Sequence, residues 1–485
     1  MVKRYLLPVI ALVVLWVASV WLIGWRTQHA IEDGLVHFNE RISTIISSDL
    51  SQADAQVSIE QYSRGWSTAH VRYRVTLTDR HGENTHYFLD DVLEHGPFPW
   101  SMLRQGQFRP VLAYSEATLE ATPDMHAWLA PDSGMETPLH ITTEVGFRGK
   151  AQSRLQLSAL ASPPDESTHI AFSGGELFLE VSDQFRTSQL RGHFDRYRQR
   201  DDHSEEVITL TGIDVDAQTS QLAESDGLDH HSQMRVESLA ISQGEGIPPM
   251  MLQGIETSLA TSQRHALMDI GLQYHVHQVE LDTARIGQLT LGMAVNRLDR
   301  EALARLQSSW RSQAEAMGPS GPEGLSETAR EELVTQLKQV LRHNPEWRLD
   351  PLIWQNEAGQ SHASAALFLQ DAIDETSGPD DWLLQGIRQA DLQISLNRAM
   401  VVALFEALAG GDTDGDSARE GVQLGEELFD AYAKSLERLG MVTRTGDDVQ
   451  LQISVTPGQN HVLLNESEIT LEQLMLLGMG LLLQF

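Results

Sequence analysis

Alternation of apolar and polar residues dominates the chain from Val57 onward and predicts a body built mainly of β-strands. In one stretch Val71, Tyr73, Val75 and Leu77 alternate with polar residues, as expected for a strand with one apolar face. Further stretches of this kind are 139–147, 155–157, 176–181, 207–215, 234–241, 269–281, 286–295, 363–369, 390–396 and 449–455. Several end in Gly, Asn or Asp, so the pattern favours antiparallel hairpins and meanders over parallel units.

Helical spacing appears mainly in the second half of the chain. The segments that show it are 299–316, 325–343, 398–409 and 419–438. The chain ends in LEQLMLLGMGLLLQF, which predicts a core or dimer-packing helix because its apolar part is too short to span a bilayer. Pro123–Pro138 and Arg198–Glu206 are typical of surface loops. The predicted fold class is α+β, predominantly antiparallel sheet with helices concentrated in the second half.

Residues 5–25 form an uninterrupted apolar run preceded by Lys3 and Arg4. As a helix the run reaches ~30 Å, the thickness of a bilayer's hydrocarbon core. A cleaved signal peptide is the alternative, but the run exceeds the usual ~7–15 apolar residues and no polar mature start follows Ala18 and Ser19. We interpret the run as a permanent anchor, which places Lys3 and Arg4 in the cytoplasm and the remaining chain in the periplasm of a bacterial inner membrane.

These patterns predict four regions along the chain. Residues 1–25 are the cytoplasmic stub and anchor, and 26–56 contain a membrane-proximal helix with apolar residues at helical spacing. Residues 57–298 form a β-rich periplasmic region, and 299–485 form a mixed α/β region with a C-terminal helix.

Composition narrows the function classes. Hydrophobic residues make up 41% of the 485 residues, enough for globular cores. The absence of cysteine excludes disulfides, thiolate metal sites and cysteine nucleophiles. The formal net charge of −33 argues against nucleic acid and against an anionic membrane surface as partner. Solubility explains the acidic excess, and adaptation to salty surroundings is a second interpretation.

No strong catalytic signature is present, and no cofactor is predicted. The chain lacks G-x-S-x-G, S-x-x-K, H-E-x-x-H and Gly-rich phosphate-loop patterns, so we expect a protein that is not an enzyme. His275 and His277 are expected on one face of a strand, a weak metal candidate without a third ligand; partial burial in the core is the favoured alternative.

A second weak metal candidate is the acidic segment containing Asp412, Asp414 and Asp416, which resembles the start of a calcium loop. Ser417 stands where the turn glycine belongs and Gln423 where a bidentate Glu is needed. A solvated connection between two helices is therefore the favoured interpretation.

The most unusual local sequence is His95-Gly96-Pro97-Phe98-Pro99-Trp100. Two prolines fix φ on either side of Phe98 and remove two backbone donors. One interpretation is a stiff turn that presents Phe98 and Trp100 at the surface. The other, which we favour, is a plug that ends a strand and packs into the core.

The order of motifs behind an N-terminal apolar segment resembles the YdgA-like family of bacterial inner-membrane proteins of unknown function. The resemblance is carried by Tyr62-x-x-Gly65 with Ser67, His95-Gly96-Pro97-Phe98-Pro99, Glu136-Thr137-Pro138, Phe172-Ser173-Gly174-Gly175 and Leu464-Asn465. It implies an inner-membrane protein with a large periplasmic body and is compatible with a homodimer. It supplies no catalytic or ligand-binding residues.

Three functions remain in competition. The first is a membrane-anchored envelope protein that binds a lipid or other apolar ligand, or an envelope protein partner, along its β-rich body. The second is a structural or assembly homodimer without a ligand. The third and weakest is a periplasmic hydrolase whose site forms only in three dimensions, which requires a pocket with convergent carboxylates or histidines of perturbed pKa.

Overall fold

The computed structural model describes residues 54–470 and residue 473, except for 79–83, 130–136, 165, 183–185, 222–226, 245–246, 283, 318–326, 372–384, 411–414 and 456–460. The predicted anchor at 5–25 and nearly all of the predicted membrane-proximal and C-terminal helices therefore lie outside the described residues. Among those that are described, no helix is both long and apolar enough to cross a bilayer.

The chain divides into two compact units, Met1–Ser220 and Gln221–Phe485, here called unit 1 and unit 2. The boundary predicted at 298/299 separates a β-rich region from a mixed α/β region. It lies one residue from the change between strand β15 (Ala284–Asp299) and helix α4 (Arg300–Met317). It therefore marks a change of secondary structure within unit 2.

Unit 1 is an antiparallel sheet. Its strands are β1 (Asp54–Arg64), β2 (Thr68–Thr78), β3 (Asn84–His95), β4 (Ala113–Leu119), β5 (Leu139–Val145), β6 (Ala151–Leu157), β7 (Leu160–Ala161), β8 (Thr168–Phe172), β9 (Gly175–Ser182), β10 (Thr187–Asp201) and β11 (Val207–Gln221). They pair in the order β1-β2-β3-β4-β5-β6-β9-β10-β11. The second half of β10 pairs with β8, which in turn pairs with β7.

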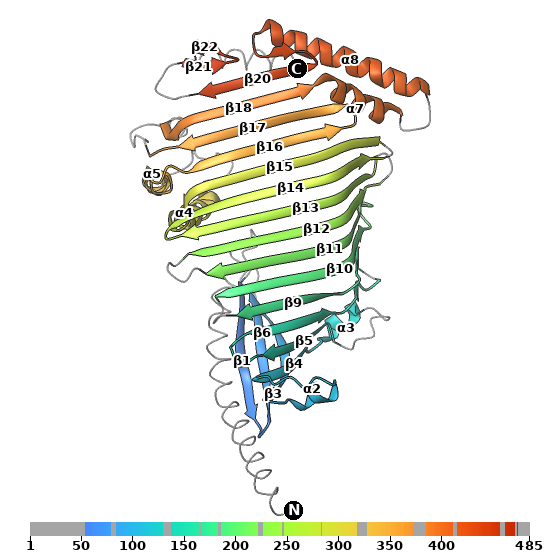
Figure 1. Cartoon of the computed structure of the whole chain (residues 1–485), viewed down its shortest axis with the longest axis vertical. Helices are drawn as coiled ribbons and strands as arrows, with labels where there is room; N and C mark the ends of the chain where they lie inside the picture. Colours follow the sequence, from blue (N-terminus) through green and yellow to red (C-terminus); the bar gives the residue numbers. More distant parts are fainter. Residues whose placement is uncertain are drawn as a thin grey trace, which may run out of the picture. The chain divides into compact units, whose positions relative to one another are not determined.

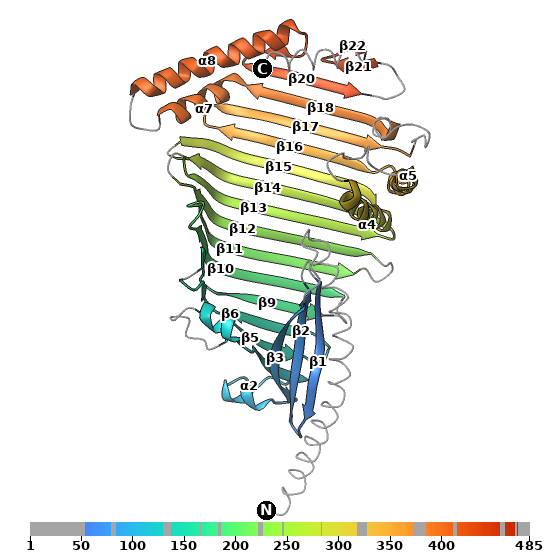
Figure 2. The same cartoon turned by 180° about the vertical axis from the view of Figure 1, so that it is seen from behind.

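The first strands of unit 1 run steeply relative to β9 and β10, so the sheet curls (Figures 1 and 2). On the inner face Ala69, Leu93 and Ala113 form a buried cluster, and two of its three side chains are alanine. Side chains without bulk let neighbouring strands twist toward one another while the face stays packed.

Two short helices accompany this sheet, α2 (Trp100–Arg104) and α3 (Pro123–Trp128). α2 packs through Met102, which is fully buried with Val111 and Tyr114. α3 begins after Thr122, whose hydroxyl accepts a hydrogen bond from the Met125 amide at 3.2 Å. A Thr cap followed directly by Pro is a typical helix start.

Unit 2 is an antiparallel meander whose strands follow chain order (Figure 1). Its strands are β12 (Leu228–Ser242), β13 (Met250–Arg264), β14 (Leu267–Leu281), β15, β16 (Glu346–Asn356), β17 (Gly359–Leu369), β18 (Ile387–Asn397), β19 (Thr443–Thr445), β20 (Asp448–Val455), β21 (His461–Leu464) and β22 (Ser467–Thr470). Each of β12–β17 pairs with the next strand, β18 pairs with β20, and β20 pairs with both β19 and β21.

Two helix pairs lie on one face of this sheet, in front of the strands in Figure 2. They are α4 with α5 (Glu327–Leu341), and α7 (Arg398–Gly410) with α8 (Gly415–Arg438). The first pair packs on the sheet through Leu298, Ala302 and Val340. The second pair is joined by Arg398, whose guanidinium lies 3.1 Å from Asp430 and 3.2 Å from Glu426.

The predicted strands are confirmed, as are the helices predicted at 299–316, 325–343, 398–409 and 419–438 and the predominantly antiparallel sheet. Two predicted loops are wrong in part. Within Arg198–Glu206 the strand β10 continues to Asp201, and within Pro123–Pro138 the first six residues form α3. Charged residues that alternate along β10 keep one face of the strand solvated, and such a run of charge is also typical of a surface loop.

Candidate functional site: an apolar sheet face

The two faces of the unit 2 sheet differ sharply in polarity because the strand register places like residues side by side. The register aligns apolar residues in a row across six strands: Leu259, Leu272, Met293, Leu349, Ala365 and Leu392. The adjacent row consists of Tyr274, Leu291, Leu352, Ala363 and Ile394. We call these two rows the apolar strip.

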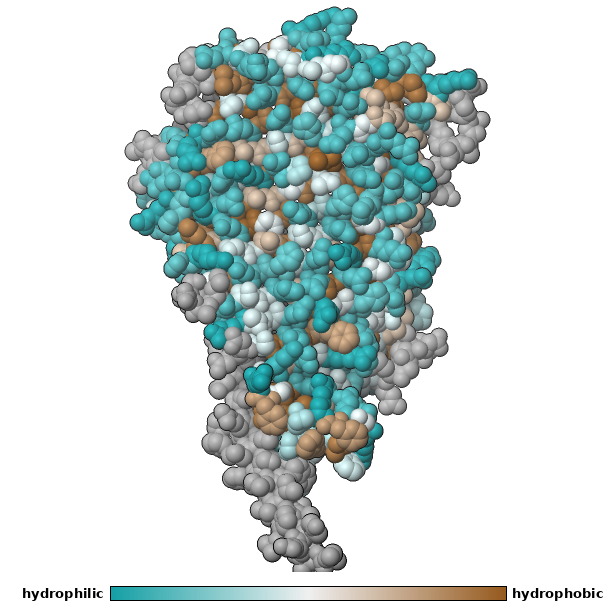
Figure 3. Space-filling view, in the orientation of Figure 1, coloured by the Kyte–Doolittle hydropathy of each residue, from teal (hydrophilic) through white to brown (hydrophobic). Residues whose placement is uncertain are grey.

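The opposite face is polar. Arg235, Glu256, His275 and Thr290 form one of its rows across β12–β15. The helix pair α4/α5 packs against Met268 and Val295 on the apolar face and stands in front of the strands in Figure 2. The polar face is therefore the one seen in Figure 3, where unit 2 is mostly hydrophilic.

None of the apolar strip residues is fully buried within the described part of the chain. All of them are intermediate in exposure. The helix pairs pack at the two ends of the strands and do not cross the strand middles of β12–β17 (Figure 2). At one end the pair α4/α5 covers Val295, and at the other the Asn356 side chain donates to the Met400 carbonyl of α7 at 3.0 Å. Between these ends lies a partly exposed apolar surface.

Unit 1 carries an apolar inner face of its own, and one carboxyl is buried in it. A row across eight strands contains Val71, Asp91, Ala117, Ile141, Leu155, Leu177, Gly192 and Val215. Asp91 is only 6% exposed. Burial raises the pKa of its carboxyl to about 6, although hydrogen bonds from Ser115 and Tyr73 act in the opposite direction. Sequence analysis missed this residue, although it breaks the apolar alternation between Leu89 and Leu93.

His95 lies on the same inner face, at the end of β3, and is 3% exposed. Neither ring nitrogen has a hydrogen-bond partner within the described residues. Burial and the nearby Arg64 guanidinium lower the pKa of the imidazole. Asp91 and His95 are four residues apart on one strand, or ~13 Å, so they do not form a catalytic pair.

A polar cleft of about 470 Å³ lies on the other face of unit 1, and its carboxylates are already engaged. The Tyr114 hydroxyl donates to Glu116 at 2.9 Å, and Lys150 lies 2.7 Å from Glu180. Hydrogen bonds from Lys150 and Gln152 lower the pKa of Glu180. A general acid needs a raised pKa, so this cleft gives the hydrolase hypothesis no support.

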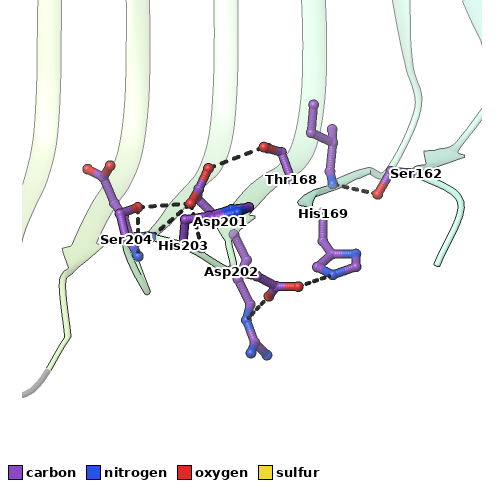
Figure 4. A network of polar contacts seen from close by, with 10 residues as sticks. Ser162, Thr168, His169, Asp201, Asp202, His203 and Ser204 are labelled. Carbon is purple, nitrogen blue, oxygen red and sulfur yellow. Dashed lines mark hydrogen bonds and ion pairs between the residues drawn. The ribbon is translucent and has the colours of Figure 1, made fainter. Parts of the chain in front are cut away.

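The polar network at the β10–β11 turn also falls short of a catalytic triad (Figure 4). His169 Nε2 lies 2.9 Å from Asp202, but the Ser162 hydroxyl accepts from the Ile170 amide at 2.9 Å. Figure 4 shows Ser162 apart from the imidazole. Asp201 accepts from the His203 and Ser204 amides at 2.8 and 2.9 Å, so the network stabilises the turn.

Of the two weak metal candidates, the histidine pair lies within the described residues and the side chains of the acidic segment do not. His275 and His277 do share a face, with ring centroids 4.5 Å apart. His275 Nδ1 lies 2.8 Å from the Thr290 hydroxyl. No group of three ligand side chains occurs in the described part of the chain. Asp412 and Asp414 lie outside the described residues, and so does the side chain of Asp416 in α8.

The His95–Trp100 motif fits the plug interpretation at its first residue and the surface-turn interpretation at its aromatic residues. His95 ends β3 and is buried, whereas Phe98 is 41% and Trp100 61% exposed. Gly96 passes so close to the next segment that an added Cβ would lie 1.8 Å from the Val111 carbonyl oxygen. Pro97 follows Gly96 through a cis peptide bond, and Pro99 precedes α2. The motif thus ends a strand and presents its aromatic rings outward.

The second motif, Phe172-Ser173-Gly174-Gly175, connects β8 to β9. The Phe172 ring lies 5.8 Å from Phe194, and the Ser173 hydroxyl accepts from the Arg196 amide at 3.0 Å. A Cβ on Gly175 would meet the Phe194 ring at 2.3 Å, and Gly174 has φ of +80°. These residues allow β8 and β9 to pair one after the other with β10. The role of the motif is therefore structural.

Comparison with known proteins agrees with the resemblance seen in the motifs. The chain is similar to Protein YdgA of Escherichia coli (strain K12), 21% identical over 484 residues that cover 96% of this chain and 94% of that protein. It is also similar to Uncharacterized protein YihF of the same organism, 18% identical, with 96% of each chain covered. No solved structure matches. The family model "Bacterial protein of unknown function (DUF945)" matches residues 3–472, and the chain therefore belongs to that family.

Proposed function

We propose that this chain is an envelope protein held at the bacterial inner membrane by residues 5–25, and that its periplasmic body binds lipid acyl chains on the apolar strip of unit 2. The observation that carries the proposal is the row from Leu259 to Leu392, which is partly exposed within the described residues. Neighbouring strands are ~4.8 Å apart, so this row extends for ~24 Å.

An acyl chain is the ligand that fits a long, narrow and uncharged surface. Each methylene transferred from water to an apolar surface is stabilised by about 0.8 kcal/mol. The strip offers leucine and methionine side chains, and Met adapts to ligands of different shape. Among its residues the Tyr274 hydroxyl is the one polar group, so the strip suits the chain of a lipid better than its headgroup.

Photo-crosslinking in intact cells tests the proposal with a matched pair of positions. Leu272 belongs to the strip, and Gln273 follows it on the polar face of the same strand. A benzophenone amino acid at position 272 is expected to form lipid adducts, detected by mass spectrometry of the purified chain. The same probe at 273 is expected to form few.

The identity of the adduct separates the competing functions. A crosslink from 272 to a second copy of the chain supports the assembly homodimer instead. Equal adduct yields at 272 and 273 refute acyl binding on this face. As a further check, Leu349→Asn two strands away is expected to lower the yield at 272 several-fold, whereas Arg348→Asn on the polar face is not.

A further inference from the structure

Three loops that are distant in sequence meet at one end of unit 1. The His95 amide donates to the Ser67 carbonyl at 2.8 Å, and the Leu112 amide donates to the Val145 carbonyl at 2.7 Å. These bonds join the β1–β2 turn, the segment between β3 and β4, and the β5–β6 turn. We call residues 64–67, 96–112 and 146–150 together the aromatic end.

Large aromatic side chains are exposed on each of these loops. They are Trp66 (52%), Phe98 (41%), Trp100 (61%), Phe108 (74%) and Phe147 (55%). Figure 3 shows apolar side chains gathered at this end of unit 1, below a mostly hydrophilic surface. A group of exposed apolar residues on an otherwise polar surface marks an interaction site.

The same loops have the opposite charge to the chain as a whole. They contain five basic residues, Arg64, Arg104, Arg109, Arg148 and Lys150, and no acidic residue, whereas the chain has 68 acidic and 35 basic residues. Glu144 and Glu180 on the adjoining strands pair with Arg109 and Lys150. The Arg104 guanidinium lies 5.4 Å from the centre of the Trp100 ring. The Glu94 carboxylate accepts from the Ser101 amide at 2.9 Å, so five basic residues meet three carboxylates and the aromatic end remains net positive.

We propose that the aromatic end docks on the surface of an anionic phospholipid bilayer. Trp side chains favour the membrane interface, and Arg and Lys are attracted to anionic headgroups. The rest of the chain is acidic and is repelled by the same surface, so the charge distribution itself orients this end toward the bilayer. The net charge of the chain argues against binding to an anionic membrane surface, but the positive charge of the aromatic end favours it.

Chain length is compatible with docking on the membrane that residues 5–25 are proposed to span. β1 ends at the aromatic end, and the ten residue steps from Arg64 back to Asp54 place Asp54 roughly 33 Å away. Residues 26–53 separate Asp54 from the apolar run. Even as a continuous helix, that length of chain reaches about 42 Å.

A single fluorescent probe tests the docking, since the chain has no cysteine of its own. The full chain carrying Phe108→Cys is labelled and reconstituted into vesicles of phosphatidylcholine, alone or with an equal amount of phosphatidylglycerol. Phe178→Cys is the matched control, because Phe178 is also exposed but lies on β9 outside the aromatic end. Aqueous iodide quenching is expected to fall several-fold at 108 in the anionic vesicles only, with no change at 178.

The charge contribution is tested by the double variant Arg104→Glu, Arg148→Glu, which is expected to abolish the protection at 108. Circular dichroism confirms that each variant is folded. Equal quenching at 108 in both vesicle types overturns the proposal. It is also overturned if protection increases with protein density, because the occupant is then a second copy, or if it requires added envelope proteins.

Discussion

Replacement of Asp91 by Asn is expected to stabilise unit 1 at neutral pH. In the folded chain burial raises the pKa of this carboxyl from 3.8 to about 6. The folded state therefore holds the proton more tightly than the unfolded state. The contribution of Asp91 to stability is most favourable below about pH 4, is lost as the pH rises to about 6, and stays low above it.

The size of the stability change follows from the pKa shift of Asp91. About two pKa units at ~1.36 kcal/mol each correspond to about 3 kcal/mol of destabilisation at about pH 7.5. Asn is neutral at every pH and keeps an acceptor for Ser115 and Tyr73, but its NH₂ group needs a partner of its own. We therefore expect Asp91→Asn to raise the unfolding free energy by about 1–3 kcal/mol at about pH 7.5 and to change it little at about pH 4.

Urea unfolding of the full chain, followed by hydrogen exchange in peptides from β2–β4, measures this effect in unit 1. Asp90→Asn is the matched control, because the neighbouring side chain is 52% exposed and pairs with Arg72. It is expected to change stability by less than about 0.5 kcal/mol. A lower stability of Asp91→Asn at about pH 7.5, or a difference from the natural chain that does not vary with pH, refutes the reasoning.

Three further outcomes follow from the packing and from the paired histidines. Gly175→Ala is expected to destabilise unit 1 by about 1–3 kcal/mol, measured as a lower urea midpoint, because its Cβ would overlap Phe194; an unchanged midpoint contradicts the contact. Met400→Ala is expected to cost about 2–5 kcal/mol, because this side chain is fully buried, and to speed hydrogen exchange in α7. Zinc titration is expected to give the same heat for the natural chain and for His277→Ala, because the histidine pair has no third ligand among the described residues; a heat lost in the variant reveals a metal site.

Many of the strands that sequence analysis identified have alternating apolar and polar residues. The stretches 269–281 and 286–295 have this pattern and form β14 and β15. β16 was missed because Pro351 interrupts its alternation, and a register shift between Leu349 and Leu352 restores the apolar face on either side of it. Only the partner strands show that this break is a bulge.

The sequence by itself determined local structure, the apolar side of each strand and membership of a family, because these depend on residues close in the chain or on motifs in order. The tertiary structure decided which residues share a surface. Register aligned Leu272 with Met293 and Leu349 in one apolar strip, and the fold buried Asp91 beside Tyr73 and Ser115.

In the His95–Trp100 motif, too, the sequence determined the local structure and the tertiary structure decided the surface. Its prolines indicated a rigid, strand-ending segment, but the sequence left open whether its aromatic rings are buried or exposed. The fold brings it beside Trp66 and Phe147, and the five aromatic and five basic residues of the aromatic end become one surface. Net charge is a sum over the whole chain, so it does not reveal such a surface; a positive patch forms only where folding gathers its residues.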